Sequence, residues 1–87
     1  LLNGRTAMVT GGTRGLGLAV ARLFAEAGAN LVLVARDEEA LDRAGRELSA
    51  PGRWVAAVPG DLSTPAGAAD ACADVLNLGR PVDILVN

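Results

Sequence analysis

The chain has 87 residues, which is room for a single domain. Its 8 basic and 10 acidic residues give a net charge of −2, and this balance excludes the strongly basic surface that binds nucleic acid or anionic membranes. With one cysteine and no histidine, an internal disulfide framework is impossible and a metal site of the usual His/Cys kind is unsupported. The sequence shows neither an apolar run long enough to span a membrane nor a secretory signal pattern, so we expect a cytoplasmic protein without a membrane partner.

The first two predicted elements are a strand and a helix, joined by a glycine-rich turn. Residues 6–10 form a short apolar run between Gly4 and Gly11, which predicts a buried strand. From Leu16 onward, apolar residues recur at helical spacing. The predicted inner face of this helix consists of Leu16, Val20, Leu23, Phe24 and Ala27. Gly28 then occupies the position after a helix where a positive φ is common.

A second strand and helix repeat the pattern. Residues 30–34 are apolar at every position after the first, as in a parallel strand covered on both faces. Asp37 is suited to cap the next helix, and Gly45 weakens that helix relative to alanine. Pro51 and Gly52 end it. Its apolar stripe comprises Leu41, Ala44 and Leu48.

The last part of the chain adds a strand, a helix and the start of a fourth strand. Residues 54–58 predict the third strand, and Thr64-Pro65 predicts a helix N-terminus. The inner face of this helix is predicted at Ala68, Ala69, Cys72, Val75 and Leu76, with Cys72 a buried and unreactive thiol. Residues 82–86 predict a fourth strand. Because this strand would leave an exposed apolar edge, we expect more chain to follow in the natural protein.

Strands and helices therefore alternate from residue 6 to residue 87. This order is typical of βαβ units with right-handed crossovers, and it predicts an α/β fold with a parallel sheet. No repeat, linker or low-complexity tract divides the chain, so residues 1–87 are assigned to one domain.

The turn T-G-G-T-R-G-L-G at residues 10–17 links the first strand to the first helix. Glycines at this place let a diphosphate reach the backbone N–H groups at the positive end of the helix. A side chain at Gly11 or Gly15 would keep the phosphates away, and the missing Cβ of Gly17 would let the helix pack tightly on the strand.

Two common phosphate-binding motifs do not fit this turn. A mononucleotide P-loop needs Lys and Ser/Thr after its last glycine, but Gly17 is followed by Leu18 and Ala19. The fingerprint Gly-x-Gly-x-x-Gly also fails, because Val20 stands where its last glycine would follow Gly15 and Gly17.

The spacing Thr-Gly-x-x-x-Gly-x-Gly, at Thr10, Gly11, Gly15 and Gly17, resembles the cofactor loop of the short-chain dehydrogenase/reductase family. Asp61-Leu62 after the third strand and D-I-L-V-N at residues 83–87 are similar to later motifs of that family. The resemblance covers essentially the whole chain. It implies a partial Rossmann-type doubly wound sheet of strand order 3-2-1-4, with residues 1–87 as the N-terminal NAD(P)-binding half and the catalytic half not present.

The resemblance also implies roles for individual residues. The loop glycines would line the pyrophosphate, Asp61 would accept a hydrogen bond from the adenine amino group beside Leu62, and Asn87 would lie near the adenosine ribose. Alternatively, Asp61 has no role in binding and is only a turn residue before a helix. The complete expected cofactor site is Thr10, Gly11, Thr13, Arg14, Gly15, Leu16, Gly17, Arg36, Asp61, Leu62 and Asn87.

The end of the second strand bears on the choice of cofactor. An acidic residue normally binds the ribose 2′-OH of NAD, but here Ala35 stands at that place and Arg36 follows it. A guanidinium pairs with a 2′-phosphate, and Arg14 can approach the same group, so NADP is expected. Alternatively, both arginines are solvated surface charges. NAD is possible if Asp37 turns toward the ribose instead of capping its helix.

The sequence contains no tyrosine and no lysine. The family's tyrosine, lysine and serine catalytic set is therefore absent from these residues, and we expect them to be inactive alone. The resemblance implies an NADP-dependent oxidoreductase that transfers hydride between the cofactor and a carbonyl or alcohol substrate, in a parent protein that forms a homo-oligomer. The alternatives are a non-catalytic dinucleotide-binding module or sensor, and an interaction fragment that binds no nucleotide.

Overall fold

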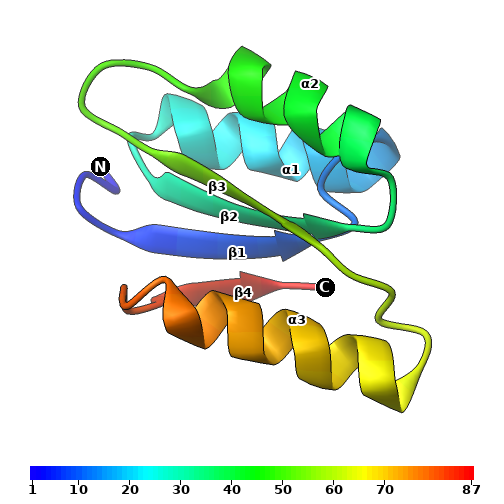
Figure 1. Ribbon diagram of the computed structural model, residues 1–87. Coiled ribbons are helices and arrows are strands. Elements are labelled where there is room, and N and C mark those ends of the chain that lie inside the picture. The colour runs from blue at the N-terminus through cyan, green and yellow to red at the C-terminus, as the bar shows by residue number, and fades with distance from the viewer.

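The computed structural model describes residues 1–87 and shows four parallel strands and three helices (Figure 1). The strand order is β3-β2-β1-β4, which confirms the order predicted from the sequence. The elements in chain order are β1 (Thr6–Thr10), α1 (Gly15–Glu26), β2 (Asn30–Ala35), α2 (Glu38–Leu48), β3 (Val55–Pro59), α3 (Pro65–Asn77) and β4 (Ile84–Val86).

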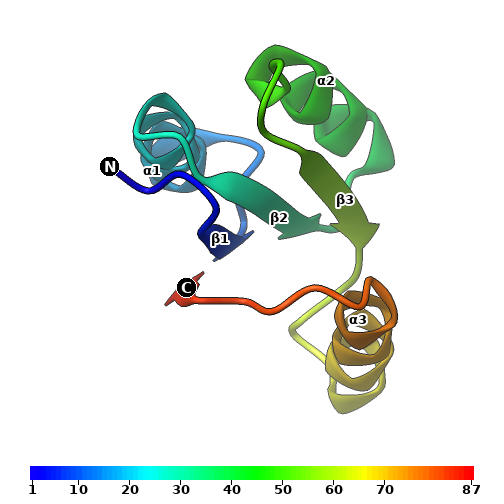
Figure 2. The same ribbon diagram turned by 90° about the vertical axis from the view of Figure 1, so that its left-hand side faces the viewer.

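The helices cover both faces of the sheet. In Figure 2, α1 and α2 lie on one side of the strands and α3 lies on the other. The apolar core is correspondingly divided, because alternate residues of a strand point to opposite faces. Leu31 and Leu33 of β2 face α1 and α2, while Val32 and Val34 face α3. All four are fully buried, so the second strand is covered on both faces as predicted.

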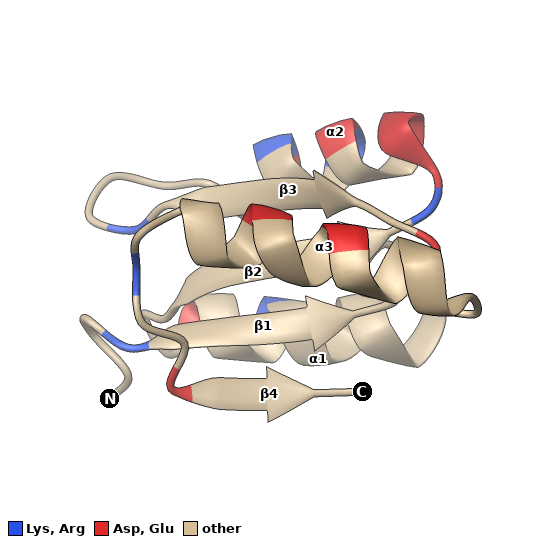
Figure 3. Cartoon of the chain, turned by 60° about the horizontal axis from the view of Figure 1, so that its bottom comes forward, with Lys and Arg blue, Asp and Glu red and all other residues tan.

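The charged residues lie outside this core. The four strands contain no Asp, Glu, Lys or Arg, and Figure 3 shows the charges on helices and loops only. None of the three helices has the length and hydropathy that crossing a membrane requires.

The predicted face of the first helix is partly wrong. Leu16 is 81% exposed and Leu23 is 66% exposed, whereas Ala21 and Ala25 are buried against the sheet. Each residue advances the helix by about 100°. The predicted face follows the larger apolar side chains and is therefore rotated about the helix axis from the face that is buried. The small alanines allow α1 to lie close to the strands.

The predicted face of the third helix is also partly wrong. Ala69, Cys72 and Leu76 are exposed, and the residue that α3 buries is Ala71. Cys72 is therefore an exposed free thiol, not a buried one. The actual inner stripe consists of Ala68, Ala71, Val75 and Leu78. Its spacing of three and four residues is helical, but it is offset from the predicted stripe by about one residue.

The last strand is shorter than predicted, covering three residues instead of residues 82–86. At Asp83, the residue before this strand, a side chain takes part in the pairing with β1. The Asp83 carboxylate accepts a hydrogen bond from the Thr6 amide at 2.8 Å, while the Asp83 amide donates to the Thr6 carbonyl at 2.9 Å. A side chain therefore replaces a ladder partner where β1 and β4 begin.

Candidate functional site

The loop between β1 and α1 is shaped by two glycines in the left-handed region. Gly11 has φ +67° and Gly15 has φ +57°, and a Cβ on either would meet no atom within 4 Å. The Gly11 amide donates to the Val34 carbonyl at 2.8 Å, which continues the β1–β2 ladder into the loop. The turn therefore follows the strand directly and leaves open space beside both glycines.

Two further glycines pack the loop against the rest of the fold. A Cβ on Gly17 would overlap the carbonyl of Gly11, and one on Gly12 would lie 3.0 Å from a methyl group of Leu33. The close approach predicted for Gly17 is present, but its partner is the loop after β1, not the strand itself. The first turn of α1 is held against the loop by this contact.

The N-terminus of α1 differs from those of the other two helices. Asp37 caps α2 and Thr64 caps α3 through side-chain oxygens, whereas α1 has no side-chain cap and no acidic residue in its first turn. The N–H groups of Gly15, Leu16 and Gly17 have no hydrogen-bond partner within the chain. Free amides at the positive end of a helix form a ready anion site.

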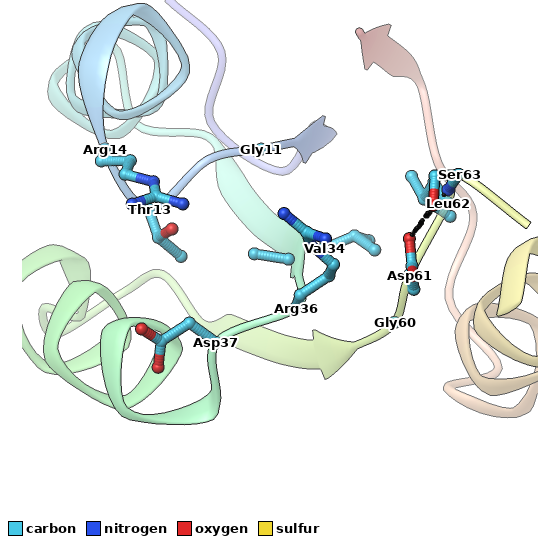
Figure 4. Close-up of a pocket in the computed structure, with 11 residues that line it drawn as sticks. Gly11, Thr13, Arg14, Val34, Arg36, Asp37, Gly60, Asp61, Leu62 and Ser63 are labelled. Atoms are coloured by element: carbon cyan, nitrogen blue, oxygen red, sulfur yellow. Dashed lines mark hydrogen bonds between the residues drawn. The ribbon is translucent and has the colours of Figure 1, made fainter.

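A hollow of about 640 Å³ lies beside this loop, at the carboxyl ends of β1, β2 and β3. Ligands of open α/β sheets bind at this end of the strands. The residues that line it, drawn in Figure 4, are Gly11, Thr13, Arg14, Val34, Ala35, Arg36, Asp37, Gly60, Asp61, Leu62 and Ser63.

One side of the hollow carries two guanidinium groups. In Figure 4 the side chains of Arg14 and Arg36 extend into the space between the loop and the end of β2. The Asp37 carboxylate turns instead to the start of α2, where it accepts hydrogen bonds from the amides of Glu39 at 3.0 Å and Ala40 at 3.2 Å. The predicted capping role of Asp37 is thus confirmed, and its charge is committed to the helix.

The other side of the hollow carries the carboxylate of Asp61. One of its oxygens, Oδ1, accepts hydrogen bonds from the Ser63 hydroxyl at 2.5 Å and from the Ser63 amide at 3.0 Å. These bonds, the hydroxyl first, lower the pKa of Asp61 below its ordinary value, and the nearby positive charge of Arg36 lowers it further. The side chain is therefore an ionised acceptor at neutral pH.

The residues predicted for the site divide into two groups. Six line the hollow, namely Gly11, Thr13, Arg14, Arg36, Asp61 and Leu62. The other five do not line it, namely Thr10, Gly15, Leu16, Gly17 and Asn87. Three of these form the first turn of α1. The remaining two meet at the ends of β1 and β4, where the Thr10 hydroxyl lies 3.0 Å from the Asn87 side-chain oxygen and 3.2 Å from the Val86 carbonyl.

The expected cofactor site did not include five residues that also line the hollow, namely Val34, Ala35, Asp37, Gly60 and Ser63. Ser63 has a readable signal, because an Asp-x-Ser sequence before a helix favours a turn in which the aspartate bonds to the backbone two residues on. The sequence around Gly60 gives no such indication. The structure shows that a Cβ there would lie 3.0 Å from the Ala71 methyl group.

Comparison with known proteins decides the family. The family profile described as short chain dehydrogenase matches residues 5–87. The chain belongs to the short-chain dehydrogenase family. The four-stranded parallel sheet and the glycine loop between β1 and α1 are thus parts of a Rossmann-like fold of this family.

Several curated members of the short-chain dehydrogenase family are similar in sequence. The chain is 45% identical over 86 residues to the rhamnolipids biosynthesis 3-oxoacyl-[acyl-carrier-protein] reductase of Pseudomonas aeruginosa. It is 46% identical over 86 residues to the galactitol 2-dehydrogenase (L-tagatose-forming) of Cereibacter sphaeroides. Each alignment covers 99% of this chain and 33% of the relative, so the chain spans about a third of the length of these relatives.

Solved structures of the family agree with the fold. The L-sorbose reductase of Gluconobacter frateurii, complexed with NADPH and L-sorbose, superposes with a TM-score of 0.91 at 40% identity, covering 99% of this chain and 33% of that one. The RhlG/NADP active-site complex of Pseudomonas aeruginosa gives 0.89 at 43% identity, covering 99% and 34%.

Proposed function

We propose that residues 1–87 are the NADP(H)-binding half of an oxidoreductase domain that interconverts a carbonyl and an alcohol by hydride transfer. Family membership supports the oxidoreductase class, and the relatives named above are reductases and dehydrogenases. The relatives are about three times as long as this chain, which supports a division between a cofactor-binding part and a substrate-binding part.

The observation that carries the cofactor assignment is the charge distribution at the end of β2. Arg14 and Arg36 face the hollow, Ala35 occupies the strand end, and the Asp37 carboxylate is held by the first amides of α2. A 2′-phosphate on the adenosine ribose would meet two cations and no free carboxylate there. The 2′-hydroxyl of NAD would lack the carboxylate acceptor that normally binds it.

The rest of the hollow fits the other parts of the dinucleotide. The free amides of Gly15, Leu16 and Gly17 would hold the pyrophosphate, because Gly11 and Gly15 leave their space open. Thr13 would lie beside the phosphates. Asp61 and Leu62 would contact the adenine ring. When bound, the nicotinamide ring supplies or accepts the hydride.

Thr10 and Asn87 would shape the site without lining the hollow. Their contact joins the ends of β1 and β4, next to the loop that begins at Gly11. Asn87 would then contribute contacts near the adenosine ribose. Because the chain has no tyrosine, lysine or histidine, the proton donor for the carbonyl oxygen would come from outside these residues.

The test is a calorimetric titration of the protein that carries these residues with NADPH and with NADH. We expect NADPH to bind more tightly, and Arg36→Ala to weaken NADPH binding by about ten- to a hundredfold, the loss for one charge-assisted hydrogen bond. Binding of NADH should change little. Arg43→Ala, an exposed arginine on α2 away from the hollow, is the matched control.

Two results would contradict the proposal. Equal affinities of the parent protein for NADPH and NADH would refute the role of the two guanidinium groups. A loss of both affinities to the same extent in Arg36→Ala would show that the arginine supports the fold instead of reading the phosphate.

A further inference from the structure

The hollow has two ends of opposite chemistry. Arg14 and Arg36 make the end near β2 cationic, while Asp61 provides a carboxylate at the end of β3. Asp37 is the other carboxylate in the lining, and it is committed to the amides of α2. A ligand that spans the hollow therefore needs an anion at one end and a hydrogen-bond donor at the other. An adenosine phosphate has both, because its base carries an exocyclic amino group.

Ser63 fixes the orientation of this acceptor. Its hydroxyl and its amide both donate to Oδ1 of Asp61, at 2.5 Å and 3.0 Å, and Oδ2 accepts no hydrogen bond within the chain (Figure 4). The two donors restrict rotation of the carboxylate before any ligand arrives. Preorganisation of this kind improves affinity, because less conformational freedom is lost on binding.

We propose that Ser63 is a positioning residue that holds Asp61 through Oδ1, so that Oδ2 accepts a hydrogen bond from the amino group of adenine. The proposal rests on the NADP(H) binding proposed above. It also predicts base selectivity. Hypoxanthine has an oxygen in place of the amino group, and that oxygen would meet the negative charge of Asp61 without a proton to share.

The experiment measures dissociation constants for NADPH and for nicotinamide hypoxanthine dinucleotide phosphate in its reduced form. We expect the parent protein to prefer NADPH by about tenfold or more, the loss for one hydrogen bond to a charged group. Ser63→Ala should reduce that preference by about three- to tenfold through weaker NADPH binding alone. Ser63→Thr, which keeps a hydroxyl, should restore it.

Ser49→Ala is the matched control, because the Ser49 hydroxyl donates to the Gly45 carbonyl at the end of α2, away from the hollow. The preference of this variant for NADPH over the hypoxanthine dinucleotide should equal that of the parent protein. Asp61→Asn provides a second measurement if Ser63→Ala fails to fold. We expect its preference for NADPH over the hypoxanthine dinucleotide to fall close to one, because the negative charge that discriminates the two bases is lost.

Two outcomes would overturn the proposal while leaving NADP(H) binding intact. The parent protein could bind both dinucleotides with equal affinity, which would show that the protein does not recognise the amino group of adenine. Alternatively, Ser63→Ala could weaken both dinucleotides by the same factor, which would assign Ser63 to the fold alone. If neither dinucleotide binds the parent protein, the proposed function fails first.

Discussion

Gly17 and Gly45 are both helical glycines, but their surroundings are opposite. A Cβ on Gly17 would overlap the carbonyl of Gly11, so the absence of a side chain is a steric requirement at the start of α1. A Cβ on Gly45 in α2 would meet no atom within 4 Å. At Gly45 the chain only bears the entropic cost of glycine in a helix.

Substitution by alanine should therefore change the free energy of unfolding in opposite directions at these two positions. We expect Gly17→Ala to lower the free energy of unfolding by about 1–3 kcal/mol, as overpacked sites do, and to displace the loop that faces the hollow. Gly45→Ala should raise it by up to about 1 kcal/mol through helix propensity. Urea denaturation of both variants checks this, and a Gly17→Ala variant as stable as the parent protein would contradict the steric argument.

Asp61 gives the protein a pH dependence at the acidic end. Its pKa is lowered mainly by the Ser63 hydroxyl, so the carboxylate stabilises the folded state above its ordinary pKa of 3.8. This contribution is lost as the pH falls through the lowered pKa. The stability difference between the parent protein and Ser63→Ala should be present at neutral pH and shrink below about pH 4.

A carbon-13 NMR titration of the Asp61 carboxyl group, with urea denaturation at each pH, measures both parts of this prediction. The pKa of Asp61 should rise toward its ordinary value in Ser63→Ala. An unchanged pKa would show that the hydroxyl does not hold the carboxylate in solution.

At the scale of the elements, their order and most of their ends were predictable because they depend on local chemistry. Asp37 and Thr64 cap α2 and α3 through their own side chains, and Gly28 leaves α1 with φ +96°. The rotation of α1 and α3 was not predictable to one residue. It depends on how closely a helix approaches the sheet, and this is decided by alanines such as Ala21 and Ala71, which carry little hydrophobic signal.

The candidate site shows the same division. The positive φ of Gly11 and Gly15 follows from the glycine pattern before a helix, which is visible in the sequence. The contact of Thr10 with Asn87 joins residues 77 positions apart, and no local pattern reports it. It exists because β1 and β4 are neighbours in the sheet.

Arg53 ties two helices together at their C-termini. Its Nε donates to the Leu48 carbonyl of α2 and its terminal nitrogen to the Ala25 carbonyl of α1, both at 2.7 Å. Carbonyls in the last turn of a helix lack helical partners, and a cation there is also favoured by the dipole. One side chain thus binds two helix ends on the same face of the sheet, and at the Ala25 carbonyl it adds to the hydrogen bond from the Gly28 amide at 2.9 Å.

Removing this side chain should destabilise both helices. We expect Arg53→Ala to lower the free energy of unfolding by about 2–3 kcal/mol, the scale of one or two hydrogen bonds from a charged donor. Arg43→Ala, which removes an exposed arginine without such bonds, should stay within about 0.5 kcal/mol of the parent protein. Thermal unfolding followed by circular dichroism compares the two, and equal melting temperatures would contradict the capping role.

At the scale of the whole molecule, the sheet separates two packed layers, and the candidate site lies at its edge. The face covered by α1 and α2 holds the larger buried cluster, which includes Leu31, Leu33 and Leu41. The hollow lies beyond the carboxyl ends of the strands and takes residues from the connections on both sides. Parallel pairing therefore brings the residues after β1, β2 and β3 to one edge, although the sequence separates them by about 25 positions each.

The position of Trp54 determines which of these two layers can be followed by tryptophan fluorescence. It packs on the α3 side of the sheet, where the guanidinium of Arg80 lies 4.4 Å from the centre of its ring. As the chain has one tryptophan and no tyrosine, its tryptophan fluorescence comes from a single indole without overlap from tyrosine. The tryptophan emission reports on the layer beneath α3, so a rearrangement confined to the opposite layer would leave that emission unchanged.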